Sequence, residues 1–165
     1  MIGAVVLAAG EASRYGAPKQ RLLLPAVLDR LAQTSVGEVV VVEGAHTLEG
    51  VALGEARLVR CPDWGRGPGA SLRCGLDAFG AEVDAAVVVL ADGPNLDPRS
   101  VERLLEERGD APIAAASYDG IRGHPVVLAR AVWSSIPDEG ARRLEAVLVD
   151  CDDLQAPGDV DFAAG

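Results

Sequence analysis

The chain has 165 residues and a formal net charge of −10, which argues against a general surface for nucleic acids or anionic membranes, because such surfaces carry clustered positive charge. Apolar residues make up 49% of the chain but aromatic residues only 4%, so we expect a core of Val, Leu and Ala in strands buried on both faces. No apolar run approaches the ~20 residues of a membrane span, and no basic segment precedes the first apolar run, so we expect a soluble cytoplasmic protein.

Short β-branched and apolar runs predict the strands. In chain order they are Gly3–Leu7, Glu38–Val42, Arg57–Val59, Ala85–Leu90, Ile113–Ala116, Pro125–Leu128 and Val147–Val149. The first and fourth of these runs are apolar throughout instead of alternating, which is typical of central strands with helices on both faces.

Helices are predicted between the strands, over Ala26–Gln33, Ala70–Phe79, Pro98–Arg108 and Arg142–Ala146. The repeated order of strand, helix and strand predicts an α/β fold, a three-layer α/β/α Rossmann-like arrangement with a mostly parallel sheet. No internal repeat or linker interrupts this order, so residues 1–165 are expected to form one domain. Ligands of such sheets bind beyond the carboxyl ends of the strands, so we expect the functional site at the loops after Leu7 and Leu90.

The cysteines are Cys61, Cys74 and Cys151. They are odd in number and lack the spacing of metal ligands. We therefore predict that all three are free thiols in a reducing compartment.

A glycine-rich segment, Leu7 to Lys19, follows the first predicted strand. Its small residues let backbone N–H groups approach phosphate oxygens, and Arg14 and Lys19 add two cations that suit a triphosphate. Lys19 is the only lysine of the chain, which indicates a need for a compact ammonium group. The alternative is a surface turn with two solvated charges. The P-loop pattern is excluded because Lys19 does not directly follow Gly16, and the dinucleotide fingerprint is absent.

The segment reads L-A-A-G-x-S-x-R-x-G-x-x-K and resembles the signature of the nucleotidyltransferases related to molybdenum cofactor biosynthesis. The resemblance extends from residue 3 to 161, with shortened stretches after Pro25 and Gly44. It implies the nucleotide-diphospho-sugar transferase type of fold, with Arg14 and Lys19 as catalytic residues. The nucleotide-binding residues that it implies are Leu7, Ala8, Ala9, Gly10, Ser13, Arg14, Gly16, Lys19 and Ser71.

Acidic residues at two places are candidate ligands of Mg²⁺. Asp92 follows the apolar run that ends at Leu90, where a buried carboxylate needs a partner and a hard cation is a natural one. A turn cap is the alternative. The family has a metal-binding Asp-x-Pro here, which implies that Asp92 is both a metal ligand and catalytic. Asp161 resembles the later acidic residue of the family's Asp-x-Asp-Thr-Pro segment and is the second predicted ligand. Asp159 competes with it, and a frayed acidic tail is the alternative.

Three further stretches resemble the acceptor side of the family. Cys61–Leu76 resembles N-P-x-W-x-x-G-x-x-x-S-L-x-x-G-L, with Cys61 in place of Asn, and includes Trp64, which packs on a flat ring or covers the core. Ser71 is predicted to cap the helix that follows and to present its N–H groups to an anion. R-G-H-P-V implies that Arg122 and His124 bind the acceptor, along with Trp64. Pro137–Leu144 resembles G-D-x-G-A-R-x-L, with Pro137 in place of Gly.

The resemblance implies a Mg²⁺-dependent nucleotidyltransferase that moves NMP from an NTP to a phosphorylated acceptor and releases pyrophosphate. Ala9, in L-A-A-G, and the Gly-Ala-Arg sequence at 140–142 favour CTP, and molybdopterin loaded with molybdenum is the favoured acceptor. The alternatives are a GTP-dependent guanylyltransferase, activation of another phosphorylated small molecule, and a non-catalytic nucleotide-binding regulatory module. The expected partners are the NTP and a pterin-type acceptor, with a molybdoenzyme or its chaperone as a candidate protein partner, and the chain is expected to be a monomer.

Overall fold

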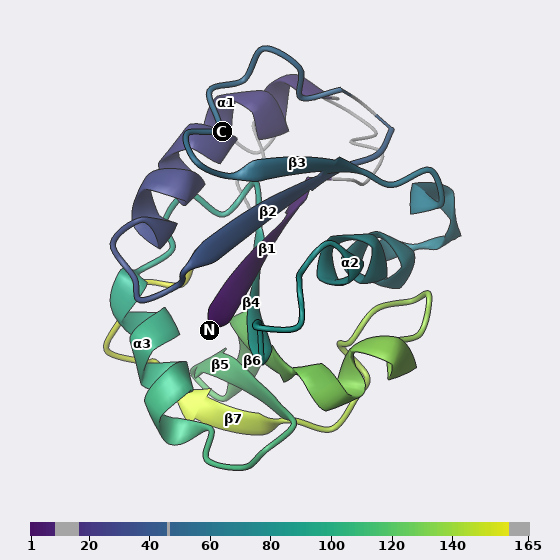
Figure 1. The fold of residues 1–165 in the computed structure, drawn as a ribbon. Coiled ribbons are helices and arrows are strands. Elements are labelled where there is room, and N and C mark those ends of the chain that lie inside the picture. The colour runs from purple at the N-terminus through teal and green to yellow at the C-terminus, as the bar shows by residue number, and fades with distance from the viewer. Residues whose placement is uncertain (9–16, 46, 159–165) are drawn as a thin grey trace.

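The computed structural model describes residues 1–8, 17–45 and 47–158, which form a seven-stranded sheet with helices on both faces (Figure 1). The strands are β1 (Ile2–Ala8), β2 (Glu38–Glu43), β3 (Arg57–Arg60), β4 (Ala85–Leu90), β5 (Ile113–Tyr118), β6 (Ile121–Ala129) and β7 (Val147–Asp150). The helices are α1 (Ala17–Leu31), α2 (Pro68–Asp77) and α3 (Pro98–Glu107), with two 3-10 helices, η1 (Trp64–Arg66) and η2 (Arg130–Ser135).

The strand order is β3-β2-β1-β4-β6-β5-β7. All pairs are parallel except those of β6, which runs antiparallel to β4 and to β5. The predicted three-layer fold with a mostly parallel sheet is confirmed. The antiparallel β6 brings its amino end to the edge of the sheet where β1 and β4 have their carboxyl ends.

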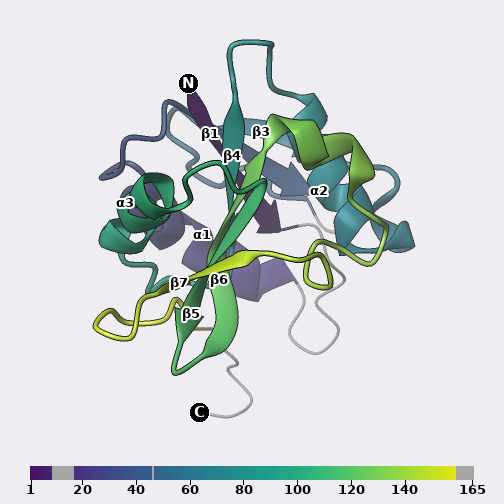
Figure 2. The ribbon, with the colours of Figure 1, turned by 90° about the horizontal axis from the view of Figure 1, so that it is seen from below.

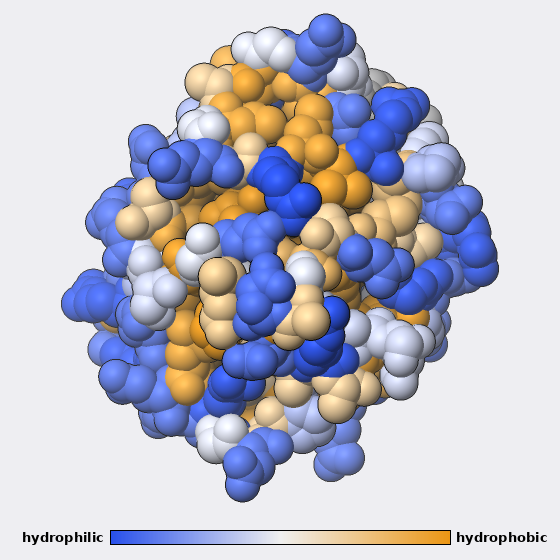
Figure 3. Space-filling model, viewed as in Figure 1, coloured by the Kyte–Doolittle hydropathy of each residue, from blue (hydrophilic) through white to orange (hydrophobic). Residues whose placement is uncertain are grey.

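Helices α1 and α3 cover one face of the sheet and α2 covers the other (Figures 1 and 2). An apolar cluster on each face holds the layers together. Side chains of α1 and α3 form the first cluster, while α2 and η2 contribute to the second. Along β1, Ala4 and Val6 belong to the first and Val5 to the second, as expected of a strand covered on both sides. In the space-filling view an apolar area surrounds the edge strand β3, where Leu58 is 38% exposed (Figure 3).

Helix α2 lies very close to the sheet at Gly75. A Cβ on this glycine would come within 2.7 Å of Val5 Cγ1 and 2.8 Å of Val42 Cγ2, distances at which a neighbour must move. The missing side chain therefore lets the carboxyl-terminal part of α2 lie close to β1 and β2.

The structure differs from the predicted helices at two places. Helix α1 begins at Ala17 rather than at Ala26, although Pro25 lies inside it. Pro25 removes one helical hydrogen bond, but its neighbour Leu24 is fully buried, and such burial offsets the loss. The predicted helix over Arg142–Ala146 is wrong, because this stretch forms turns, and η2 was not predicted.

The prediction of three free thiols is wrong for two of them. Cys61, directly after β3, and Cys74, in α2, form a disulfide with a Cα–Cα distance of 5.8 Å. Cys151 is free and buried. The bond joins the end of an edge strand to the helix that covers it, a proximity that only the fold creates.

We expect the Cys61–Cys74 bond to stabilise the protein by about 3 kcal/mol, the chain-entropy value for a loop whose ends are 13 residues apart. A thiol reductant should lower the midpoint of chemical unfolding, as should the double variant Cys61→Ala/Cys74→Ala. The midpoint of that double variant should not respond to reductant. An unfolding curve of the wild type that is the same with and without reductant would contradict this account.

Among the described residues, no helix is both long enough and apolar enough to cross a membrane.

Candidate active site

The carboxyl ends of β1 and β4 lie side by side. Ala91 N donates a hydrogen bond to Leu7 O at 3.0 Å, so the two strands are still hydrogen-bonded at the residue directly before Asp92. The glycine-rich segment leaves β1 at this same edge. Because β6 is antiparallel to β4, with Val126 opposite Val88, Arg122 and His124 lie towards this edge too. The structure therefore brings Leu7, Asp92, Arg122 and His124 to one edge of the sheet.

A cleft of about 640 Å³ opens here on the α2 side of the sheet. Its apolar lining consists of side chains from β1, β4, β6 and α2, among them Leu7, Leu72, Val88, Leu90, Val126 and Leu128. Charged and polar groups line the rest: Arg122 and His124 from β6, and Glu139 and Arg142 from the segment after η2. A flat apolar ring system with polar edges would suit such a cleft.

A smaller cavity of about 190 Å³ adjoins the cleft, with Leu90, Gly123 and His124 in both linings. Its other lining residues include Gly93, Pro157 and Gly158. His124 therefore lines both the larger cleft and the smaller cavity, which lies beside the turn that carries Asp92.

The environment of His124 favours the neutral ring. Burial, and next the positive charges of Arg122 and Arg142, lower the pKa of His124 below its ordinary value of 6.5. The backbone is held as well, since Tyr118 Oη donates to His124 O at 2.8 Å. A neutral imidazole can accept a hydrogen bond at one nitrogen and donate one at the other near neutral pH.

The lowered pKa of His124 predicts how stability depends on pH. Its stabilising contribution is complete above the unfolded value near 6.5 and is lost as the pH falls towards the lower folded value, because the unfolded chain then binds the extra proton. The free energy of unfolding of the wild type should therefore fall more steeply between about pH 7 and 5 than that of His124→Gln. Parallel curves for the two proteins in urea titrations would contradict this expectation.

Arg122 is bound to the opposite wall of the cleft. Its guanidinium donates to Leu144 O at 2.6 Å and to Ala141 O at 3.0 Å. Ala141 O also accepts from Leu144 N at 3.0 Å, so Arg122 binds a turn of residues 141–144 at both of its ends. The acceptor-binding role of Arg122 stays a prediction.

Asp92 is the candidate metal ligand within the described part of the chain. No three His, Cys, Asp or Glu side chains cluster there as a metal site. The C-terminal segment runs beside the turn of Asp92, because Asn95 N donates to Pro157 O at 3.2 Å and a Cβ on Gly93 would lie 3.2 Å from Gly158 O. Asp161 is three residues beyond Gly158, within about 11 Å along the chain.

Some of the remaining predicted residues lie in described helices and strands, and the others lie outside the described residues. Lys19 lies in the first turn of α1 rather than in a loop, and Leu7 and Ala8 belong to β1. Ser71 lies within α2, which begins at Pro68 with Gly67 as its N-cap, so the predicted cap is wrong. Trp64 packs against the apolar cluster on the α2 face. Outside the described residues are Ala9, Gly10, Ser13, Arg14, Gly16, Asp159 and Asp161.

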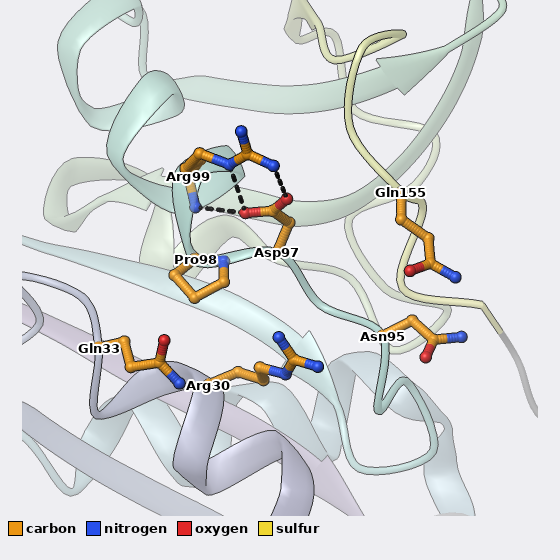
Figure 4. Close-up of a pocket in the computed structure, with 7 residues that line it drawn as sticks. All are labelled: Arg30, Gln33, Asn95, Asp97, Pro98, Arg99 and Gln155. Carbon is orange, nitrogen blue, oxygen red and sulfur yellow. Dashed lines mark hydrogen bonds and ion pairs between the residues drawn. The ribbon is translucent and has the colours of Figure 1, made fainter.

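A third hollow, of about 320 Å³ and with a polar lining, lies between the end of α1 and the start of α3 (Figure 4). Asp97 caps α3 by accepting from Arg99 N at 2.9 Å, and the Arg99 side chain returns to the same carboxylate at 3.1 and 2.8 Å. This pairing lowers the pKa of Asp97. None of the predicted site residues that the structure describes lines this hollow.

Residues 4–154 match the family of MobA-like NTP transferase domains. The chain belongs to this family. Rv0371c from Mycobacterium tuberculosis H37Rv is a similar solved structure, 26% identical, with a TM-score of 0.83 over 99% of this chain and 94% of that one. Its complex with manganese is 24% identical, with a TM-score of 0.80 over 98% and 93% of the two chains.

A curated relative of this MobA-like NTP transferase is the bifunctional protein GlmU of Sorangium cellulosum (strain So ce56). The two are 31% identical over 130 residues, which are 67% of this chain but only 28% of GlmU. The predicted family is thus confirmed. Nucleotidyltransferases of this type use a divalent metal ion, and the related Rv0371c complex holds manganese.

Asp138 and Glu139 were not predicted as site residues, and Arg142 entered only as part of the Gly-Ala-Arg sequence at 140–142. The signal was present in the family-like stretch from Pro137 to Leu144, but that stretch alone does not say which side chains face a ligand. The fold does, since Glu139 and Arg142 line the cleft.

Proposed function

We propose that this MobA-like NTP transferase moves a nucleoside monophosphate from an NTP, preferably CTP, to the phosphate of a molybdopterin-type acceptor, with Mg²⁺ as cofactor. One observation carries the proposal: the joined ends of β1 and β4 bring the start of the glycine-rich segment and the turn of Asp92 to the edge of the sheet at which Leu7 and Leu90 line an apolar cleft with charged groups. A triphosphate over the segment and a ring system in the cleft would then meet at Asp92.

The donor groups at this edge fit a hard cation. Asp92 offers carboxylate oxygen, the ligand type that Mg²⁺ prefers. Asp161 comes three residues after Gly158 in the sequence, and Gly158 lies against Gly93, which directly follows Asp92. We therefore infer that Asp92 and Asp161 would hold the metal. When bound, Mg²⁺ supplies positive charge to phosphate oxygens around the reacting phosphorus.

The reaction requires alignment more than covalent chemistry. An oxygen of the acceptor phosphate bonds to the α-phosphorus of the NTP. The bond from that phosphorus to the oxygen that bridges to the β-phosphate breaks, and pyrophosphate leaves with the electron pair. Arg14 and Lys19 hold the leaving pyrophosphate by charge and hydrogen bonds. The cleft walls keep the acceptor in line with the bond that breaks.

The choice of cytidine rests on Ala9 in Leu7-Ala8-Ala9-Gly10 and on Gly140-Ala141-Arg142, which resemble the cytidylyltransferase branch. A flat acceptor with polar edges would suit the cleft, because its lining combines apolar side chains with Arg122, His124 and Arg142. A GTP-dependent reaction is the second candidate. A nucleotide-binding module without catalysis differs from both in that it would release no pyrophosphate.

A thermal-shift panel of CTP, GTP, ATP and UTP, each with and without Mg²⁺, tests the nucleotide assignment. A nucleotide that binds the folded chain raises its stability in proportion to RT ln(1 + [L]/Kd). We expect the largest shift with CTP, and only when Mg²⁺ is present. A larger shift with GTP would replace the cytidine assignment, and a shift independent of the metal would favour the non-catalytic module.

A further inference from the structure

The segment that carries the outer wall of the cleft rests directly on the start of α2. Gly69 N donates to Asp138 O at 2.8 Å. A Cβ on Gly69 would overlap Pro137 O, and a Cβ on Gly67 would overlap Asp138 O. The two backbones are therefore in contact, with no space for a side chain between them.

The carboxylate of Asp138 is bound by two arginines of the α2 region. Arg66 Nη2 lies 3.2 Å from Asp138 Oδ2, and Arg73 donates to Asp138 Oδ1. Arg73 also donates to Ile136 O, so one guanidinium holds two points of the same segment. The hydrogen bond from Arg73, first, and the charge of Arg66 lower the pKa of Asp138, which keeps it ionised over the working pH range.

The residues next to Asp138 face the cleft. Glu139, Gly140, Ala141 and Arg142 all line it, while Asp138 is absent from the lining. Beyond them, Arg122 binds the carbonyls of Ala141 and Leu144. The wall is thus fixed at one end through Asp138 and at the other through Arg122.

We propose that Asp138 is a positioning residue, which sets the wall formed by residues 139–142 against the acceptor without touching the acceptor itself. This inference rests on the proposed function, in which the cleft holds the acceptor while the NTP binds at the glycine-rich segment. It predicts a specific kinetic signature, because a displaced wall weakens contacts with one substrate only.

Two variants disturb the contact from opposite sides. Asp138→Asn removes the charge that the two arginines bind, and Gly69→Ala pushes the backbone of the segment away.

Each of these two variants has a matched control. Asp153 is held by Arg103 in a similar carboxylate–guanidinium pair, at 2.6 and 2.9 Å, between α3 and the segment after β7, so Asp153→Asn breaks a comparable pair elsewhere. Gly65 has no atom within 4 Å of its Cβ position, so Gly65→Ala adds a methyl group without a collision.

Initial rates of transfer from CTP to molybdenum-loaded molybdopterin, with each substrate varied in turn, give the readout. Asp138→Asn and Gly69→Ala should raise KM for the acceptor by roughly ten- to a hundredfold and leave KM for CTP within about twofold. Hydrogen exchange should quicken at the amides of Gly69 and Gly140 in both variants, whereas the sheet stays protected. Both control variants should keep the wild-type KM for the acceptor.

An unchanged KM for the acceptor in the two variants would overturn the inference, as would an equal rise for both substrates or an equal rise in the controls. CTP-induced thermal shifts show that each variant is folded, so loss of structure is distinguishable from loss of positioning. If the wild type releases no pyrophosphate with any NTP, the proposed function fails, and the assignment of Asp138 to an acceptor fails with it.

Discussion

Asp92→Asn is expected to lower the rate of nucleotidyl transfer by about a thousandfold or more, without unfolding the protein. The side chain keeps its size but loses the charge that binds a divalent cation, and the developing charge on the phosphate oxygens is then poorly stabilised. The measurement is pyrophosphate release at saturating NTP and Mg²⁺. Binding of Mn²⁺, followed by its electron spin resonance signal, should weaken in parallel.

Asp97→Asn is the matched control for Asp92→Asn. Asp97 follows the same strand and caps α3 through Arg99, so its loss should reduce stability by about 1 kcal/mol and leave the rate unchanged. An Asp92→Asn enzyme with wild-type activity would remove the metal from the proposed mechanism.

Lys19→Ala should be the second most damaging change, with a loss of roughly a hundred- to a thousandfold in kcat, because the leaving pyrophosphate loses a cation. Lys19→Arg should recover only part of this, since a planar fork does not replace a compact ammonium. Lys19 is also the only lysine of the chain, so an amine-directed reagent can label only Lys19 and the N-terminus.

Protection of Lys19 against that reagent gives a test that does not depend on catalysis. CTP with Mg²⁺ should slow labelling of Lys19 but not of the N-terminus, whose amino group lies 3.2 Å from Asp84 Oδ2 and serves as an internal control. Equal labelling with and without nucleotide would show that Lys19 does not contact the triphosphate.

The strands were predictable because burial on both faces leaves an unbroken apolar signal. Ala85–Leu90 was predicted with the bounds that the structure has, and all its residues except Leu90 are buried. β6 was placed too short, from Pro125 instead of Ile121, because polar Arg122 and His124 interrupt the pattern where the strand faces the cleft. The error thus falls on residues of the candidate site.

Interactions between distant parts of the chain could not be predicted. The Cys61–Cys74 bond depends on α2 lying over β3, and the pair of Arg66 and Asp138 joins residues 72 positions apart. The edge that brings Leu7 and Asp92 together was predictable, since parallel strands end at a common edge. Which residues line the wall opposite that edge depends on how residues 136–144 dock on α2, and no local pattern contains this.

Pyrophosphate release from CTP, with molybdenum-loaded molybdopterin and Mg²⁺, tests the central claim most directly. We expect release that requires both the acceptor and the metal, that produces one pyrophosphate for each cytidylylated acceptor, and that is faster with CTP than with GTP. The absence of release with all four NTPs, from protein that still binds nucleotide in the thermal-shift panel, would contradict the assignment of nucleotidyl transfer to molybdopterin.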